Sequence, residues 1–399
     1  MILNIQQVGY YRVDYDTALW QAIISQLNEN HEEIHSINRA ILQEEIALAW
    51  TEFNRVTVAH ILEILNYFDK EFDSITWSKA YDNLNRLNER LFGTYAYDTF
   101  LEFVVRITEN QINETGYNGF DGEDPERTSL RSFIKPWNCW ANYEKCSVQD
   151  HAEFLKYYID GNQLAVFDYC NAIKLVNKTM FDDILNNVLT NSVFANRILF
   201  LANLGCSPVA ENLQNLLNSI LNVLNTLTRP ERAQIIANTY TKSSIALEIT
   251  LDFLDQNAAA LYDIMGEFIE QLLMSMPSYI NGQKNTAKYQ SILTKFHGFG
   301  LISNENLNKA TDSVASNNAW ITQNYKNILD YFGLEEITDP PTTTPNTTPI
   351  ASTPSQTSTA ASDEPTTLAP TTTTQGASSI MVSMFIMFFC VIISFIFTK

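Results

Sequence analysis

The residues with the clearest potential for chemistry are two histidines near the N-terminus. Residues 31–35 read H-E-E-I-H, which matches the H-E-x-x-H pattern of zinc-binding helices. On an α-helix this spacing places the imidazoles of His31 and His35 on one face, where both can bind a zinc ion. Glu32 lies beside them and could act as the general base that activates a metal-bound water. A helix here would therefore predict metal-assisted hydrolysis.

The surrounding sequence argues against this use. Helices that bind zinc in this way are usually buried and apolar, whereas the motif follows the polar stretch 28–30 and precedes Ser36, which we expect to cap the next helix. Gluzincin peptidases carry a distant glutamate as third ligand, and the corresponding residue here is Asn54. Three nearby glutamates could serve as an alternative third zinc ligand: Glu44, Glu45 and Glu52. We interpret the match as a chance pattern with two exposed histidines, and assign no catalytic or metal-binding residue.

Composition narrows the function further. The chain has 399 residues, of which 45% are hydrophobic, so it can bury a sizeable core. The formal net charge is −20, and because phosphate binding needs a basic face, we exclude nucleic acid as a partner. The sequence contains no G-x-S-x-G elbow, P-loop or dinucleotide-binding fingerprint.

The elements that would position these residues are predominantly helical. Seven of the 12 prolines lie within residues 339–370, and the Pro-poor sequence before them shows apolar residues at helical spacing. Asp16 can cap a helix that begins at Thr17, and Ser36 a second helix. Further helices are expected at 56–69, 75–92, 94–112, 147–158, 178–190, 192–204, 209–226, 229–239, 241–255, 281–297 and 303–332. Most connections are short, which predicts an all-α fold, an α-solenoid of antiparallel helix pairs of the HEAT or armadillo kind.

The two ends of the chain differ from this helical body, which we place at residues 16–337. Residues 3–15 alternate loosely and carry Val and Tyr, which predicts one residual β-strand. We therefore interpret residues 1–15 as the remnant of a β-sandwich or linker. Residues 338–379 are rich in Thr, Ser and Pro, a composition typical of a disordered, O-glycosylated stalk. The hydrophobic tail 380–399 is long enough to span a membrane as a helix.

The hydrophobic tail has two interpretations, a signal for a glycosylphosphatidylinositol (GPI) anchor or a single C-terminal transmembrane helix. Only Lys399 follows its uncharged run, which favours the GPI signal, with Ser362 as the attachment residue and Gly376 as the alternative. Either anchor places the body on the extracellular face of the plasma membrane. Because the first 30 residues contain no signal peptide, we expect Met1 to be an internal methionine of a longer protein.

Residues that secretion would modify agree with an outward-facing body. Four cysteines precede the hydrophobic tail and can pair in three ways: Cys139, Cys146, Cys170 and Cys206. N-glycosylation sequons begin at Asn113, Asn177 and Asn346. The cysteine count alone does not select a connectivity.

Several spaced segments resemble one enzyme family. Residues 4–16 (NIQQVGYYRVDYD) resemble the segment by which aminopeptidase N-type zinc exopeptidases pass from a small β-sandwich into a C-terminal helical domain. Residues 34–40 (IHSINRA) are similar to the next family signature, and residues 169–173 (YCNAI) and 204–207 (LGCS) to its cysteine segments. The resemblance covers about residues 2–333. The stalk and tail resemble those of GPI-anchored midgut forms from insects.

The resemblance implies a fold and a role. It implies the disulfides Cys139–Cys146 and Cys170–Cys206, and a helical domain that covers the catalytic cleft, forms a wall of an internal peptide chamber and in some members mediates homodimers. The family's zinc helix, its G-A-M-E-N loop for the substrate amine and its oxyanion-stabilising tyrosine are not found in these 399 residues. Zinc is thus a cofactor of the full-length family, and this chain is expected to carry none.

Two functions follow from this comparison. In the first, the chain is the non-catalytic C-terminal lid of a membrane-anchored zinc aminopeptidase that removes N-terminal residues from peptides. Its partners are then the catalytic domain of the same polypeptide, peptides in the chamber and the membrane. The alternative is an autonomous, receptor-like binding module on the cell surface, without enzyme activity.

Overall fold

The computed structural model describes residues 2–141, 143–162 and 165–335. Within these ranges every regular element is a helix, which confirms the all-α fold class. The described residues belong to one compact unit, Met1–Pro341. The second unit, Thr342–Lys399, lies outside the described residues and contains most of the expected stalk and all of the hydrophobic tail.

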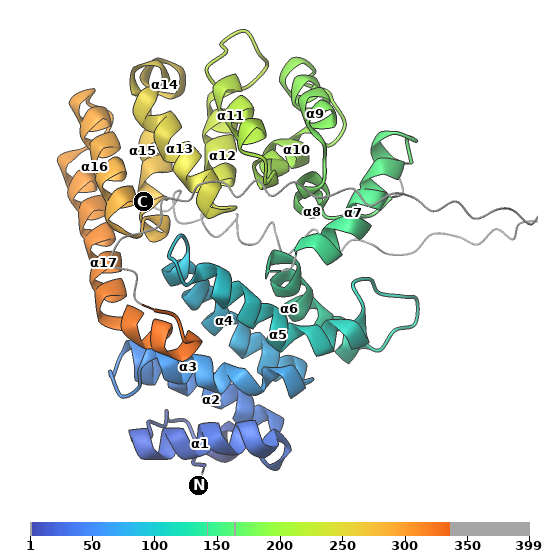
Figure 1. Ribbon diagram of the computed structural model, residues 1–399, viewed down its shortest axis with the longest axis vertical. Helices are drawn as coiled ribbons and strands as arrows, with labels where there is room; N and C mark the ends of the chain where they lie inside the picture. Colours follow the sequence, from blue (N-terminus) through green and yellow to red (C-terminus); the bar gives the residue numbers. More distant parts are fainter. Residues whose placement is uncertain (1, 142, 163–164, 336–399) are drawn as a thin grey trace, which may run out of the picture. The chain divides into compact units, whose positions relative to one another are not determined.

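Six α-helices come first along the chain, as Figure 1 shows from blue to green-blue. They are α1 (Thr17–Asn30), α2 (Ser36–Thr51), α3 (Val58–Leu65), α4 (Ser74–Leu91), α5 (Tyr97–Thr115) and α6 (Pro125–Ala141), with the 3-10 helices η2 (His31–Glu33) and η3 (Asn66–Lys70) between them. Helix α2 packs on α4, and α5 packs on α6 and η3. The buried stripe of α5 consists of Phe100, Val104 and Ile107, which recur at helical spacing and are fully buried.

The remaining helices vary in length from six residues in α8 to 29 in α17. They are α7 (Tyr143–Tyr158), α8 (Tyr169–Lys174), α9 (Lys178–Thr190), α10 (Arg197–Asn203), α11 (Ala210–Ser219), α12 (Arg229–Tyr240), α13 (Ser244–Gln256), α14 (Ala258–Met265), α15 (Phe268–Met274), α16 (Gln283–Gly298) and α17 (Asn304–Phe332), with η4 (Leu204–Cys206) and η5 (Pro277–Tyr279). Most of their contacts join helices close in sequence, for example α12 with α13 and α16 with α17.

Helix α17 also contacts the beginning of the chain, to which it returns. It runs from beside α16 to beside α3 (Figure 1). Arg90 at the end of α4 donates to Asn317 Oδ1 at 2.6 Å, and Asn317 Nδ2 donates to the carbonyl of Pro277 at 2.7 Å. Near the end of α17, the hydroxyl of Tyr331 donates to the carbonyl of Leu62 at 3.3 Å. Helix α17 thereby links helices α1 to α6 with helices α7 to α16.

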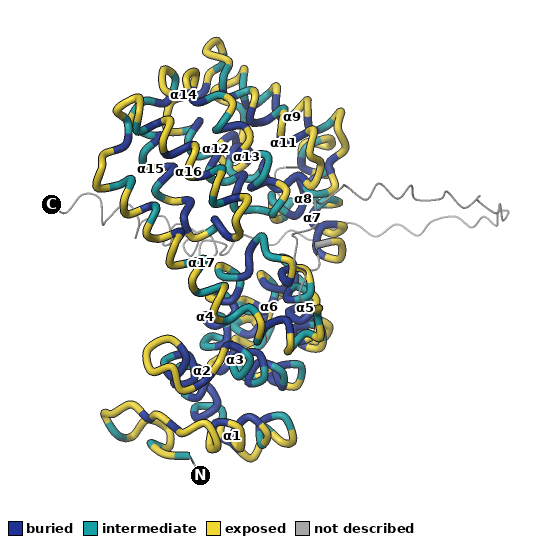
Figure 2. Tube along the Cα trace, turned by 60° about the vertical axis from the view of Figure 1, so that its left-hand side comes forward, coloured by how far each residue is buried: buried dark blue, intermediate teal, exposed yellow. Residues whose placement is uncertain are grey.

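The described residues do not show the predicted N-terminal strand. Ile5–Gln7 form a short 3-10 helix, η1, and most side chains before Arg12 are exposed, as the yellow N-terminal trace in Figure 2 shows. A strand must pair its backbone groups with a neighbouring strand, and the described residues offer none. Instead, Asn4 satisfies the backbone locally: its Oδ1 accepts from Gly9 N at 2.8 Å, and its Nδ2 donates to the carbonyl of Tyr11 at 2.8 Å.

The helix caps confirm one prediction and correct another. Asp16 caps α1, because its Oδ1 accepts a hydrogen bond from Leu19 N at 2.8 Å. Ser36 does not cap α2 but is its first residue. The N-cap is His35, whose Nδ1 accepts from Ile37 N at 3.2 Å. An imidazole nitrogen here accepts the hydrogen bond that a serine hydroxyl oxygen usually accepts.

Candidate functional site

The H-E-E-I-H segment is split between two elements. His31 begins η2, whereas His35 stands outside η2 as the cap of α2. The ring of His31 packs against that of Tyr67, with centroids 5.5 Å apart. Because the segment changes from a 3-10 helix to extended backbone at Ile34, the two imidazoles do not share a helical face.

These residues do not fit a zinc ion. A protein site needs three side chains converging on one point, with the histidines neutral. Burial lowers the pKa of His31, but His35 commits a nitrogen to the helix cap and Glu32 is exposed. Glu44 forms an ion pair with Lys79 instead of approaching the histidines as a ligand. Within the described ranges no group of three or more His, Cys, Asp or Glu could hold a metal, so we derive no zinc chemistry for this chain.

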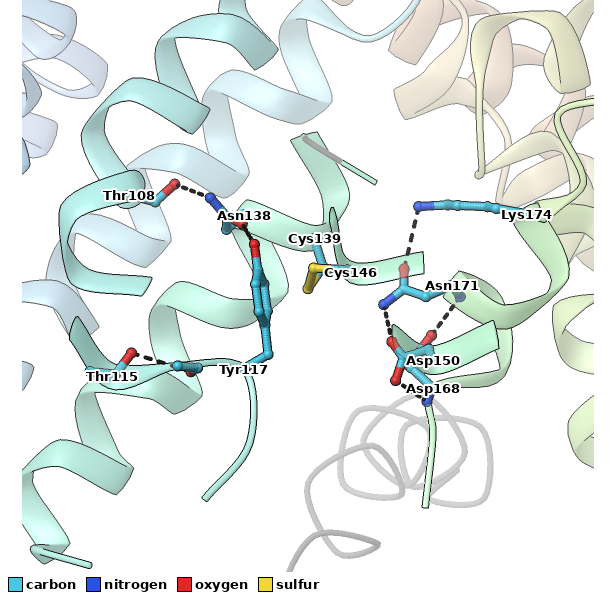
Figure 3. Close-up of a disulfide and its surroundings, with 11 residues drawn as sticks. Thr108, Thr115, Tyr117, Asn138, Cys139, Cys146, Asp150, Asp168, Asn171 and Lys174 are labelled. Carbon is cyan, nitrogen blue, oxygen red and sulfur yellow. Dashed lines mark hydrogen bonds between the residues drawn. A yellow bond between two sulfur atoms is a disulfide. The ribbon is translucent and has the colours of Figure 1, made fainter. Parts of the chain in front are cut away.

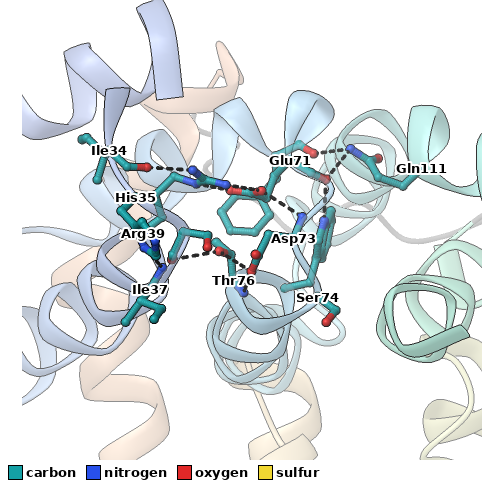
Figure 4. A network of polar contacts seen from close by, with 12 residues as sticks. Ile34, His35, Ile37, Arg39, Glu71, Asp73, Ser74, Thr76 and Gln111 are labelled. Carbon is teal, nitrogen blue, oxygen red and sulfur yellow. Dashed lines mark hydrogen bonds and ion pairs between the residues drawn. The ribbon is translucent and has the colours of Figure 1, made fainter. Parts of the chain in front are cut away.

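The segment that follows the motif builds a buried ion pair. Arg39 on α2 donates from Nε to Glu71 Oε2 at 2.5 Å and from Nη2 to Oε1 at 2.7 Å (Figure 4). Its third hydrogen bond runs from Nη1 to the carbonyl of Ile34 at 2.7 Å. The side chains of Arg39 and Glu71 are 9% and 1% exposed. This bidentate geometry is what makes burial of two charges tolerable.

The backbone around Glu71 is held from two further helices. Trp77 on α4 donates its indole N–H to the carbonyl of Glu71 at 2.8 Å. Gln111 on α5 donates to the same carbonyl at 3.0 Å and to that of Phe68 at 2.6 Å (Figure 4). One connection therefore joins α2, η3, α4 and α5. The arrangement fixes four elements and exposes no reactive group.

Two disulfides join later elements. Cys139–Cys146 links α6 to α7 with a Cα–Cα distance of 5.4 Å, and Cys170–Cys206 links α8 to η4 at 5.3 Å. This is the pairing that the family resemblance implied. Figure 3 shows the first bridge between two polar clusters. On one side Asn138 donates to Thr108 Oγ1 at 3.1 Å; on the other, residues of α7 and α8 meet, where Asn171 donates to Asp150 at 2.9 Å.

The remaining predicted site residues divide between described and undescribed parts. Asn113 is exposed near the end of α5, and Asn177 is exposed at the N-cap of α9. Asn346, Ser362, Gly376 and the hydrophobic tail lie outside the described residues. In the described part of the chain, no helix combines the length and apolar character that a membrane span requires.

Comparison with known proteins decides the family. The sequence-family model named ERAP1-like C-terminal domain matches residues 1–316 of this chain. The chain belongs to the ERAP1-like C-terminal domain family. This membership confirms the resemblance read from the N-terminal and cysteine segments.

Curated relatives of this ERAP1-like domain are aminopeptidases and a related ectoenzyme. The chain is 26% identical over 366 residues to the membrane alanyl aminopeptidase of Heliothis virescens, which covers 87% of the chain and 35% of that protein. It is 26% identical to aminopeptidase N of Plutella xylostella (65% and 28%) and 23% identical to the thyrotropin-releasing hormone-degrading ectoenzyme of Rattus norvegicus (79% and 30%). The chain thus spans about a third of the length of these relatives.

The structure also explains two of the segments that resemble the family. The IHSINRA segment supplies both the α2 cap and Arg39 of the buried pair. In the LGCS segment, a Cβ on Gly205 would lie 2.7 Å from the carbonyl oxygen of Asn238 and from Cα of Thr239 on α12. The ERAP1-like domain therefore uses glycine here because η4 presses directly on the backbone of α12.

We expect the isolated ERAP1-like chain to bind no stoichiometric zinc and to release no product from aminoacyl-arylamide substrates. The physical reason is the separation of His31 and His35 into a packed ring and a helix cap. Elemental analysis and a chromogenic assay on the purified full chain check this. Zinc at one equivalent, together with turnover abolished by His35→Ala, would refute it.

Proposed function

We propose that this ERAP1-like domain is the non-catalytic C-terminal part of a membrane-anchored zinc aminopeptidase. There it covers the catalytic cleft and forms a wall of the chamber that receives peptides. The observation that carries the proposal is the match of residues 1–316 to a domain that makes up about a third of its aminopeptidase relatives. The catalytic domain of the same polypeptide is the principal partner and supplies the zinc, and a homodimer belongs to the same proposal.

The exposed N-terminal segment supports a covalent neighbour. Ile5, Val8 and Tyr11 are apolar or aromatic, yet their side chains are 60%, 89% and 60% exposed. Exposed apolar side chains that lie near one another usually mark an interaction surface. Residues 1–15 are then the linker that meets the preceding domain. Burial of such side chains against that domain would hold the helical domain at a fixed place over the cleft.

The helical body is proposed to be an α-solenoid of helix pairs over residues 16–337. Support comes from the contacts between helices close in sequence from α11 to α16. A superhelix of this kind offers a concave inner surface, which suits a chamber wall. This arrangement would let one face line the chamber while the outer turns face solvent.

Sequencing of the complete transcript tests the proposed function. We expect an in-frame upstream region that encodes a signal peptide, a G-A-M-E-N loop and a zinc helix with its distant glutamate. A transcript whose open reading frame begins at Met1, with the product still delivered to the cell surface, would instead support the receptor-like module.

We further predict a GPI anchor attached at Ser362. The physical argument is that the polar stretch 338–379 precedes the hydrophobic tail 380–399, which is the order of spacer and tail in a GPI signal. Intact cells that express the chain behind a heterologous signal peptide should release it with phosphatidylinositol-specific phospholipase C. A bulky Ser362→Trp change should reduce release, whereas Gly376→Trp should not. Retention of the protein on the cells, with Cys390 still present in it, would show a transmembrane helix.

A further inference from the structure

Asn177 lies where a glycan can attach without disturbing the fold. It is the N-cap of α9, and its Oδ1 accepts a hydrogen bond from Met180 N at 3.0 Å. The residue is exposed, and so is Thr179, the third residue of its sequon. An N-linked sugar attaches to the other atom of the carboxamide, Nδ2. The cap and the glycan therefore use different atoms of one side chain.

A shallow hollow opens beside this residue. It has a volume of about 430 Å³ and is lined by Tyr158, Ile159, Asn177, Thr179, Met180 and Asp183. The hydroxyl of Tyr158 donates to Asp183 Oδ2 at 2.6 Å and accepts from Asn187 Nδ2 at 3.2 Å, so the aromatic ring is held in place. Ile159 is 64% exposed although it is apolar. The hollow thus combines an aromatic ring, two apolar side chains and a carboxylate.

We propose that Asn177 carries an N-linked oligosaccharide whose first N-acetylglucosamine packs into this hollow. The apolar face of the sugar and its acetyl methyl group would cover Tyr158 and Ile159, and its hydroxyl or amide groups would reach Asp183. A fold that leaves apolar groups exposed gains stability when they are covered. The inference rests on the proposed extracellular location, because the donor is found in the secretory pathway.

The modification itself is a group transfer from a lipid-linked oligosaccharide diphosphate. A bond forms between Nδ2 of Asn177 and C1 of the first sugar. The bond between that C1 and the diphosphate oxygen breaks, and the lipid diphosphate leaves with the electron pair. The carboxamide loses one proton to the transferring enzyme. No oxidant or reductant is required.

The other described sequon provides a contrast within the same chain. Asn113 is exposed but lies inside the last turns of α5, and its sequon partner Thr115 is buried, with Oγ1 donating to the carbonyl of Gln111 at 2.8 Å. The carbonyl of Thr115 accepts from Arg131 at 2.8 Å. Asn113 does not line the hollow beside α9. A sugar on Asn113 would therefore leave the stability of the fold unchanged.

The first test maps the glycans. The full chain is expressed on the surface of insect cells behind a heterologous signal peptide and purified in detergent, and the modified sequons are identified by mass spectrometry after peptide-N-glycosidase F treatment in heavy-oxygen water. We expect modification at Asn177, and its loss in Thr179→Ala. A purified chain that carries sugar on other sequons but none on Asn177 would overturn the inference.

The second test asks whether the first sugar occupies the hollow. An endoglycosidase leaves a single N-acetylglucosamine, whereas Asn177→Asp removes the sugar and keeps the cap, because Asp and Asn cap helices about equally well. We expect the single-sugar form to melt about 2 °C above Asn177→Asp. Ile159→Ser should shrink this difference, and Asn113→Asp should not change the melting temperature. If Ile159→Ser leaves this difference in melting temperature unchanged, the first sugar does not pack into the hollow and the inference is overturned.

The same mapping on protein isolated from native tissue separates this inference from the proposed function. Sugar on Asn177 in the heterologous chain, with no sugar on any sequon of the native protein, would show that the proposed surface location is wrong. Native protein with sugar on other sequons but not on Asn177 would refute the inference and leave the proposed function standing.

Discussion

Replacement of Arg39 by methionine is expected to lower the free energy of unfolding by about 3–5 kcal/mol. The change leaves the carboxylate of Glu71, whose side chain is 1% exposed, without its cation in a dry interior. It also frees the carbonyl of Ile34, which accepts from Arg39 Nη1. Chemical denaturation of the full chain measures the loss.

The control for this prediction is a surface pair of the same chemistry. Arg55 donates to Asp14 at 3.2 Å with a side chain that is 62% exposed, so Arg55→Met should cost less than about 1 kcal/mol. The double change Arg39→Met with Glu71→Leu should recover much of the loss, because no buried charge remains. Equal costs for Arg39→Met and Arg55→Met would contradict the structural role of the buried pair.

Loss of the Cys170–Cys206 bridge is expected to have the second largest effect. The cysteines are 36 positions apart, against 7 for Cys139 and Cys146, and in the chain-entropy model a longer loop constrains the unfolded chain more. Replacement of both Cys170 and Cys206 by serine should cost about 3–4 kcal/mol, and the same change at the other bridge about 2 kcal/mol. Thermal and chemical unfolding of the two double variants give the comparison. A larger loss at Cys139 and Cys146 would show that local geometry, not loop length, sets the stabilisation.

Local signals predicted many helices but not all of them. The cap at Asp16 and the long last helix follow from residues close together in sequence, and α17 begins within one residue of the predicted segment 303–332. The predicted helices do not include α6, which contains Pro136, a residue that is unfavourable inside a helix. The packing of α6 on α5 outweighs that local penalty.

Asparagine chemistry explains another error. The segment 209–226 was predicted as one helix, yet α11 ends at Ser219. Asn222 Oδ1 accepts from Leu224 N at 2.9 Å, and Asn225 Oδ1 from Leu227 N at 3.1 Å, so these side chains form local turns that compete with the helix.

The candidate site shows what sequence spacing cannot reveal. The H-E-x-x-H pattern is visible in the sequence, but its rejection depends on the change of backbone at Ile34. The partner of Arg39 is 32 positions away, beyond the reach of any helical periodicity. Likewise, the sequon at Asn177 is readable in the sequence, whereas the hollow beside it requires α7 and α9 to pack together.

The central claim is that this ERAP1-like domain works as part of a longer zinc aminopeptidase. The most direct test isolates the native protein with an antibody against residues 16–337 and measures its length, zinc content and aminopeptidase activity in one preparation. We predict a polypeptide of which this chain is about a third, with one zinc ion and activity that the separately expressed chain lacks. A native cell-surface polypeptide of 399 residues, with neither zinc nor activity, would contradict the claim.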